Sequence, residues 1–243
     1  MKERRKGMML SEIPFLNGPV LFKSAGFDYV IIDTEHGGFD YQTISALITT
    51  SRLVGLECII RLPDNTRRDI IRYMDMGADG LLLQMTNNAE DISKVVEYAK
   101  YYPLGHRGIS TMRAHTMYSP KPLKEYMKEA NERTKIYAQI ETIEGLKNAK
   151  EILSVEGVNG FLMGPNDLSC DLGCIGETSE QIIKEIERLT KISHALHKES
   201  GIITSNKTYI GEAKRAGMEL YCVGSELSML KQSAVSTVKL IEE

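Results

Sequence analysis

Short apolar runs rich in β-branched residues alternate along the chain with longer segments whose apolar side chains recur at helical spacing. The runs that predict strands lie at residues 8–10, 29–33, 57–62, 80–84, 136–141, 160–164, 201–205 and 219–224, and the first of them is weak. The segments that predict helices lie at residues 20–25, 41–54, 65–78, 89–101, 122–132, 144–153, 179–198 and 209–216, with a final helix towards the C-terminus. The pattern predicts eight strands, each followed by a helix.

The predicted strands are apolar almost throughout, which is typical of parallel strands covered on both faces. Eight strand–helix units within 243 residues predict an α/β protein with a (β/α)8 TIM barrel, and we expect residues 1–243 to form one domain. A doubly wound open sheet is the alternative arrangement. No GxGxxG segment and no P-loop segment supports a nucleotide-binding version of that sheet.

Charge and composition exclude several classes of partner. The net charge is −3 without a basic patch, so we expect no nucleic-acid partner. The opening residues are charged but no apolar run of useful length follows them, so we expect neither a signal peptide nor a membrane span, and a cytoplasmic protein. The four cysteines are scattered, and Cys170 and Cys174 form a CxxxC without a second pair, which favours reduced thiols over a zinc site.

Polar residues occur where most of the predicted strands end, and active sites of such barrels form at the C-terminal ends of the strands. These residues are Asp33, Glu35 and His36 after the second strand, Arg61 and Asp64 after the third, Gln84 after the fourth, Gln139 and Glu141 in the fifth, Asn166 and Asp167 after the sixth, Ser205, Asn206 and Lys207 after the seventh, and Ser225 and Glu226 after the eighth. We expect them to surround a common mouth.

Two carboxylates in this set suggest a metal site. Gln139 and Glu141 are two residues apart, so they share one face of their strand and point into the mouth. Glu141 and Asp167 come from neighbouring strands and offer oxygen ligands to a hard divalent cation, Mg²⁺ or Mn²⁺. The alternative is that Asp167 caps a short helix and Glu141 pairs with a lysine.

Arg61 and His36 suggest catalytic roles. Arg61 stands in the apolar run "CIIRLP", where a charged guanidinium needs a partner. It is either one half of a buried ion pair or a clamp for a carboxylate or an oxyanion. His36 lies three residues after Asp33, whose carboxylate could fix the imidazole tautomer for a general base. Gly37 and Gly38 would let the backbone approach a ligand closely.

The segments "FDYVIIDTEHGGF", "IIRLPDN", "GADGLLLQMTNNAED", "YPLGHRGIS", "AQIETIEGLKN" and "VNGFLMGPNDLSCDLG" together resemble the HpcH/HpaI family of class II pyruvate aldolases. The resemblance extends over residues 26–230, and the IDxEH, QIET and GPxDLS segments occur in the family's order. It implies a TIM barrel of the phosphoenolpyruvate/pyruvate type and a hexamer whose last helices are exchanged between neighbours.

The resemblance also implies roles for individual residues and a reaction. Glu141 and Asp167 match the metal ligands, His36 the catalytic base with Asp33 behind it, and Arg61 the residue that holds pyruvate and stabilises its enolate. The implied substrate-contacting residues are Gln139, Gly164, Pro165, Asn166 and Arg113. The expected enzyme is a metal-dependent aldolase that cleaves or forms a carbon–carbon bond of a 2-oxo acid, pyruvate or oxaloacetate, with an aldehyde or acyl partner.

Departures from the family pattern leave alternatives open. The loop "STMRAHTMYSPKP" is short, and only Arg113 and Ala114 are recognisable in the region that shapes the aldehyde side. A citrate synthase that condenses oxaloacetate with acetyl-CoA for siderophore biosynthesis is the main alternative, and a non-catalytic oxoacid-binding barrel is another. A Schiff-base aldolase is disfavoured, because the strands at 136–141 and 160–164 contain no lysine. His106 and His115 are interpreted as surface loop residues.

Overall fold

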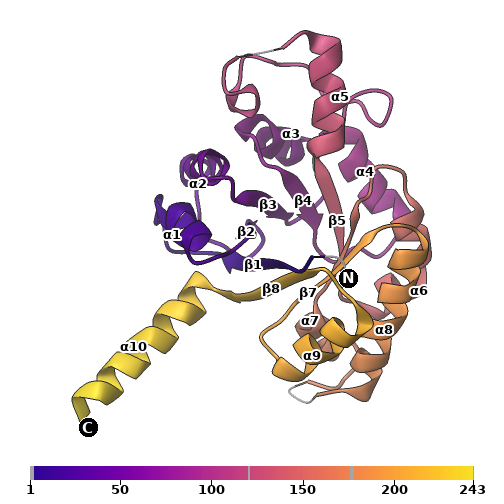
Figure 1. Ribbon diagram of the computed structural model, residues 1–243. Helices are drawn as coiled ribbons and strands as arrows, with labels where there is room; N and C mark the ends of the chain where they lie inside the picture. Colours follow the sequence, from indigo (N-terminus) through magenta and orange to yellow (C-terminus); the bar gives the residue numbers. More distant parts are fainter. Residues whose placement is uncertain (1–2, 120, 176–177, 243) are drawn as a thin grey trace.

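Eight parallel strands close into a barrel in the computed structural model, which describes residues 3–119, 121–175 and 178–242 (Figure 1). Each strand pairs with its neighbours in sequence, and β8 pairs with β1 to close the sheet. The closure confirms the predicted TIM barrel and excludes the open doubly wound sheet. The strands are β1 (Arg5–Leu10), β2 (Tyr29–Asp33), β3 (Glu57–Leu62), β4 (Gly80–Leu83), β5 (Lys135–Ile140), β6 (Gly160–Met163), β7 (Glu199–Ile203) and β8 (Leu220–Ser225).

The helices cover the outside of this barrel, with the exception of the last. They are α1 (Gly18–Ser24), α2 (Tyr41–Leu53), α3 (Arg67–Met76), α4 (Ala89–Ala99), α5 (Leu123–Arg133), α6 (Ile143–Ser154), α7 (Pro165–Asp171), α8 (Glu180–Ala195), α9 (Lys207–Ala216) and α10 (Glu226–Glu242), with a 3-10 turn at Ala114–Thr116. The hydrophobic pattern did not predict α7 as an element, because seven residues are too few for helical periodicity to show. Within the described residues, no helix combines the length and the apolarity that crossing a membrane requires.

The core has two parts, as the alternation of side chains along a strand requires. The larger part lies between the strands and the helices and includes Ile136, Ala138 and Ile140 of β5. The smaller part fills the barrel and includes Tyr137 of the same strand. Gln139 has the same parity as Tyr137 and therefore points to the barrel axis, as predicted.

The first strand is longer than the sequence pattern predicted, because its start is polar. β1 begins at Arg5, whose guanidinium lies 2.7 Å from the Glu57 carboxylate and 3.7 Å from that of Glu199. These three charged residues lie at the N-terminal ends of their strands. They close the bottom of the barrel with ion pairs, and leave the C-terminal end as the open mouth.

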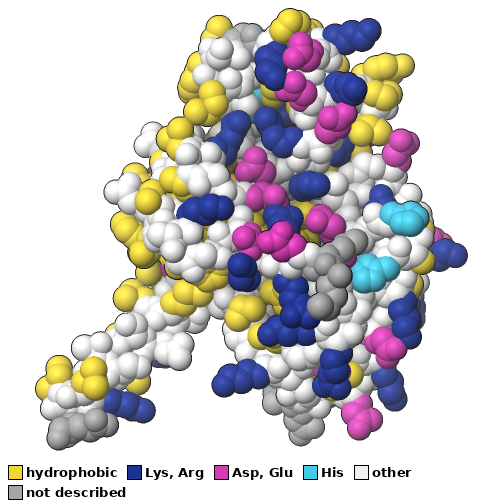
Figure 2. Space-filling view, in the orientation of Figure 1, with side chains coloured by type: hydrophobic (Ala, Val, Ile, Leu, Met, Phe, Trp, Pro, Cys, Tyr) yellow, Lys and Arg dark blue, Asp and Glu magenta, His cyan; other side chains and the backbone are white. Residues whose placement is uncertain are grey.

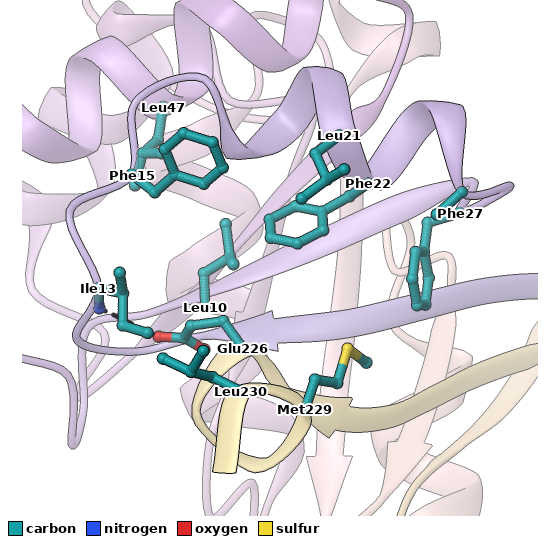
Figure 3. Close-up of a pocket in the computed structure, with 11 residues that line it drawn as sticks. Leu10, Ile13, Phe15, Leu21, Phe22, Phe27, Leu47, Glu226, Met229 and Leu230 are labelled. Carbon is teal, nitrogen blue, oxygen red and sulfur yellow. Dashed lines mark hydrogen bonds between the residues drawn. The ribbon is translucent and has the colours of Figure 1, made fainter. Parts of the chain in front are cut away.

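The last helix does not pack along the barrel; α10 projects away from it (Figure 1). Its first residue, Glu226, is buried, and its Oε1 accepts hydrogen bonds from the backbone N–H groups of Ser11, Glu12 and Ile13 at 2.7, 2.7 and 3.3 Å. Figure 3 shows this carboxylate beside an apolar cavity of about 520 Å³. The cavity is lined by Leu10, Ile13, Phe15, Leu21, Phe22, Ala25, Phe27, Leu47, Glu226, Met229 and Leu230.

We expect Glu226→Ala to lower the free energy of unfolding by roughly 1–3 kcal/mol, because three backbone N–H groups lose their acceptor. Urea denaturation followed by circular dichroism measures this change. Glu151→Ala is the control, since Glu151 is exposed on α6 and its loss should stay within about 0.5 kcal/mol. Equal midpoints for the two variants would show that Glu226 does not anchor α10.

Candidate active site at the barrel mouth

A buried ion pair joins the ends of β2 and β3. Asp33 and Arg61 are register partners on these strands. Arg61 Nε donates to Asp33 Oδ1 at 3.0 Å and Nη2 to Oδ2 at 2.6 Å, and the side chains are only 10% and 4% exposed. Burial alone would raise the pKa of Asp33, but the hydrogen bonds and positive charge of Arg61, together with the backbone N–H groups of His36 and Glu35, outweigh it and leave that pKa below its ordinary value. The prediction that Arg61 needs a buried partner is confirmed.

Glu35 and His36 follow in the loop after β2. Glu35 Oε2 lies 3.2 Å from Arg61 Nη1, and its Oε1 lies 3.7 Å from His36 Nε2. The imidazole of His36 is 76% exposed. The predicted contact between Asp33 and this ring is wrong, because both Asp33 oxygens are engaged by Arg61. Asp33 instead meets His36 through the backbone, with Oδ1 accepting from the His36 N–H at 3.2 Å.

Gly37 and Gly38 lie where the loop and a neighbouring backbone segment approach each other closely. A Cβ on Gly37 would collide with the carbonyl oxygen of Asp33 and lie 2.8 Å from that of Ser11. Gly38 has open space around its Cα and donates its N–H to the Ser11 carbonyl at 2.9 Å. The close approach that Gly37 permits is therefore between backbone segments, and it shapes the turn that carries Glu35 and His36.

Glu141 is a buried carboxylate on the other side of the mouth. It is 2% exposed, and its oxygens accept from the Met85 backbone N–H at 2.8 Å and from Gln139 Nε2 at 2.5 Å. Burial raises the pKa of Glu141 to about 7, and the negative charges of Asp167 and Glu35 add to the shift. Met85 adopts a left-handed backbone conformation, with φ of 45°, in which its N–H reaches the carboxylate. No sequence signal could have identified this donor, because any residue has a backbone N–H.

The segment after β6 forms the beginning of α7. Gly164 precedes the helix, Pro165 is its first residue, and Asn166 and Asp167 follow in the exposed first turn. A Cβ on Gly164 would collide with the Glu141 carboxylate, so glycine is required for α7 to approach β5. Asp167 lies near enough to Glu141 for its charge to raise that pKa. The two residues therefore lie at the same end of the barrel, within reach of each other's charge.

The mouth has the donor set that a hard divalent cation requires. Glu141 has no described cationic partner within ion-pair distance, the Oε1 atom of Gln139 is buried without a partner, and Asp167 adds a second negative charge. In the part of the chain that the structure describes, no three or more His, Cys, Asp or Glu side chains form a ready-made metal cluster. The residues fit a cation held by two protein carboxylates and completed by other oxygen ligands. Figure 2 shows acidic and basic side chains gathered near the middle of one face.

Two loop predictions differ from the structure. Arg113 does not join the mouth, because its loop packs at the opposite end of the barrel: the Arg52 guanidinium, in the last turn of α2, donates to the Ala114 and His115 carbonyls at 3.1 and 3.2 Å. The sequence interpretation places both His106 and His115 at the surface. This is correct for His106, whose side chain is 80% exposed, and wrong for His115. His115 is 1% exposed, with its ring bonded to the Tyr126 hydroxyl and the Ser110 carbonyl.

The barrel and its mouth define a class of protein: a TIM-barrel enzyme that combines an arginine with neighbouring carboxylates at the strand ends. The family model described as HpcH/HpaI aldolase/citrate lyase matches residues 21–231, so the chain belongs to this family. This finding confirms the resemblance and the predicted class of carbon–carbon lyase.

Three similar proteins illustrate the range of the family. A hydroxypyruvate/pyruvate aldolase from Roseovarius nubinhibens is 31% identical over 217 residues, which cover 88% of this chain and 84% of the relative. The crystal structure of an HpcH/HpaI aldolase from Desulfitobacterium hafniense is 29% identical, with a TM-score of 0.93 and coverage of 99% and 93%. The structure of the citrate synthase SbnG is 25% identical, with a TM-score of 0.87 and coverage of 99% and 94%.

We expect Asp33→Ala to destabilise the fold by about 3–5 kcal/mol, because it leaves the Arg61 guanidinium buried with an incomplete set of partners. Chemical denaturation at pH 7 measures the loss. The pKa of Asp33 in the folded protein lies below the ordinary 3.8. The stabilisation that ionised Asp33 provides is therefore complete above pH 3.8, and it is lost as the pH falls through the pKa of the folded state. The more exposed pair of Arg188 and Glu185, 2.6 Å apart with side chains 42% and 20% exposed, provides the control, and Glu185→Ala should cost no more than about 1 kcal/mol.

Proposed function

We propose that this protein is a metal-dependent aldolase that cleaves or forms a carbon–carbon bond of a 2-oxo acid through a pyruvate enolate. One observation carries the proposal: a buried guanidinium, Arg61, and a buried carboxylate without a described cationic partner, Glu141, face the same barrel mouth. The first can hold an anionic substrate and the second can hold a cation. Aldolases among the similar proteins support the same chemistry.

Glu141 and Asp167 would hold the cation, Mg²⁺ or Mn²⁺, whose oxygen preference matches two carboxylates. When bound, the cation supplies positive charge that polarises the 2-oxo group and stabilises negative charge developing on it. Gln139 holds the Glu141 carboxylate in place through its side-chain amide. Gly164, Pro165 and Asn166 form the neighbouring wall, where the substrate would lie.

Arg61 and His36 would carry out the steps that belong to the chain. Arg61 retains N–H donors beyond those it gives to Asp33, and they can bind the oxo acid and the enolate oxygen. His36 would take the proton from the 4-hydroxyl group of the substrate. The C3–C4 bond then breaks, the aldehyde leaves, and its former bonding pair becomes the π bond of the pyruvate enolate. Condensation runs the same steps in reverse. The exposed imidazole of His36 can reach such a hydroxyl.

A citrate-synthase reaction is the second candidate, and the structural likeness to the citrate synthase SbnG favours it. The same enolate apparatus would then act on oxaloacetate, with acetyl-CoA as the partner and citrate as a siderophore precursor. A Schiff-base mechanism has less support. Lys135 begins β5 at the end of the barrel away from the mouth, and Lys207 is exposed at the start of α9. A barrel that binds oxo acids without turnover is the non-enzymatic alternative.

We propose a homohexamer in which α10 of one copy covers the apolar cavity of another. The cavity of Figure 3 lies where the last helix of a barrel would pack, and α10 points away from it. The helix exposes Leu230, Val235, Val238, Leu240 and Ile241, which are 47–81% exposed. An exchanged helix would bury both apolar surfaces, which a soluble monomer rarely leaves open.

We expect the protein with Mg²⁺ to release pyruvate from oxaloacetate faster than a protein-free blank, and EDTA or Glu141→Gln to remove the excess rate. Coupling to lactate dehydrogenase measures pyruvate, while free CoA and citrate are followed with acetyl-CoA present or absent. Glu144→Gln is the matched control, since Glu144 is exposed three residues further along. In the cleavage of a 4-hydroxy-2-oxo acid, His36→Ala should lose about 10²-fold or more, with Mg²⁺ binding unchanged.

The products separate the three functions. Pyruvate that depends on the cation, with no CoA released, supports the aldolase. Citrate and CoA that appear only with acetyl-CoA support the synthase instead. Oxaloacetate binding by calorimetry without any product would support the non-catalytic barrel. Near-wild-type cleavage by His36→Ala would exclude this histidine as the base.

We expect the native protein to have about six times its chain mass of 27.2 kDa, and Val238→Glu to reduce that mass. Sedimentation velocity or light scattering measures both. Lys239→Glu is the control, because it changes an adjacent residue on the same helix from one charge to another. A monomeric wild type, or an unchanged mass for Val238→Glu, would contradict the exchanged helix.

A further inference from the structure

One carboxylate at the mouth has no part in the mechanism described above. Glu35 lies between the proposed clamp and the proposed base, with Oε2 at 3.2 Å from Arg61 Nη1 and Oε1 at 3.7 Å from His36 Nε2. Its side chain is only 18% exposed, whereas the His36 ring is 76% exposed. Glu35 is thus the more buried member of the second contact, and His36 is the more exposed one.

The turn holds Glu35 in this place from several directions. Asp33 Oδ1 accepts the backbone N–H of Glu35 at 3.0 Å, while the same carboxylate grips Arg61. The Thr34 hydroxyl donates to the Arg61 carbonyl at 2.6 Å, which ties the loop to β3. The tight packing at Gly37 closes the other side of the turn. The position of Glu35 is therefore set by the ends of two strands.

We infer that Glu35 is a positioning residue that links the substrate clamp to the base: one oxygen holds Arg61 and the other orients the His36 imidazole. The inference deepens the proposed function and rests on it for the roles of Arg61 and His36. With Nε2 turned towards Glu35, Nδ1 is the ring nitrogen left to face the substrate. His36 Nδ1 would take the hydroxyl proton, and the carboxylate would stabilise the resulting imidazolium.

Among the described charged groups near His36, the Glu35 carboxylate is the one within ion-pair distance of the ring. Arg61 on β3 is neutralised by Asp33 on β2. Asp167 of α7 and Glu141 after β5 act on the Glu35 carboxylate through their charge, and burial raises its pKa. At 3.7 Å the contact is longer than a hydrogen bond, so it acts on the ring through charge.

The test is an NMR comparison of the His36 ring in wild type and in Glu35→Gln. Glutamine keeps an acceptor for Arg61 but removes the charge beside His36. We expect the ring signals of His36 to move in Glu35→Gln, because the carboxylate no longer lies beside Nε2. The signal of His36 is assigned from its loss in His36→Gln, and the reading does not depend on turnover.

The chain offers a matched control in an unrelated pair. His106 Nδ1 lies 3.8 Å from Glu97 Oε1, and both side chains are exposed, so Glu97→Gln removes a similar contact outside the site. It should shift only the His106 signal and leave activity unchanged. Glu35→Gln should also lower kcat about 10-fold and change KM no more than about 3-fold.

Each outcome decides the inference. Unchanged ring signals of His36 in Glu35→Gln, or a loss of activity confined to KM, would overturn the positioning role and leave Glu35 as a partner of Arg61 alone. Ring signals that move, together with the expected loss of kcat, support it. Ring signals that move in a protein whose wild type releases no pyruvate would support the contact and reject the proposed function, so the two failures are distinguishable.

Discussion

The ion pair between Arg61 and Asp33 is the interaction on which the mouth of this barrel depends. A guanidinium inside a parallel barrel must be neutralised by a partner that the fold holds in place. The register of β2 and β3 sets the two residues side by side, and the same aspartate organises the turn that follows. Arg61, His36 and Glu35 are therefore all positioned by one buried contact.

On the other side of the mouth, the Glu141 carboxylate has no described cationic partner within ion-pair distance. Glu141 is buried with only neutral donors around it, and its pKa of about 7 reflects the cost of keeping it ionised there. Together with Asp167 it forms a place where a divalent cation would improve stability as well as supply chemistry. A buried charge that the folded chain does not neutralise is a candidate for binding a ligand of opposite charge.

The outer surface also has apolar regions that the described part of the chain leaves uncovered, here the side chains of α10 and the cavity beside its start. An anchor at Glu226 holds the start of α10, while the rest of the helix leaves the barrel with apolar side chains uncovered. A cavity lined by α1, α2 and the start of α10 remains beside it. The proposed exchange of last helices between copies would cover both apolar surfaces.

The sequence pattern predicted the barrel but left an open doubly wound sheet as an alternative, which the pairing of β8 with β1 excluded. The positions of polar residues at strand ends drew attention to Arg61, Glu141 and Asp167, and the family resemblance suggested their roles. Only the tertiary structure decided their partners. It assigned Asp33 to Arg61 rather than to the His36 ring, and it placed Glu35 between Arg61 and His36. Such contacts depend on strand register and loop path, which hydrophobic periodicity does not encode.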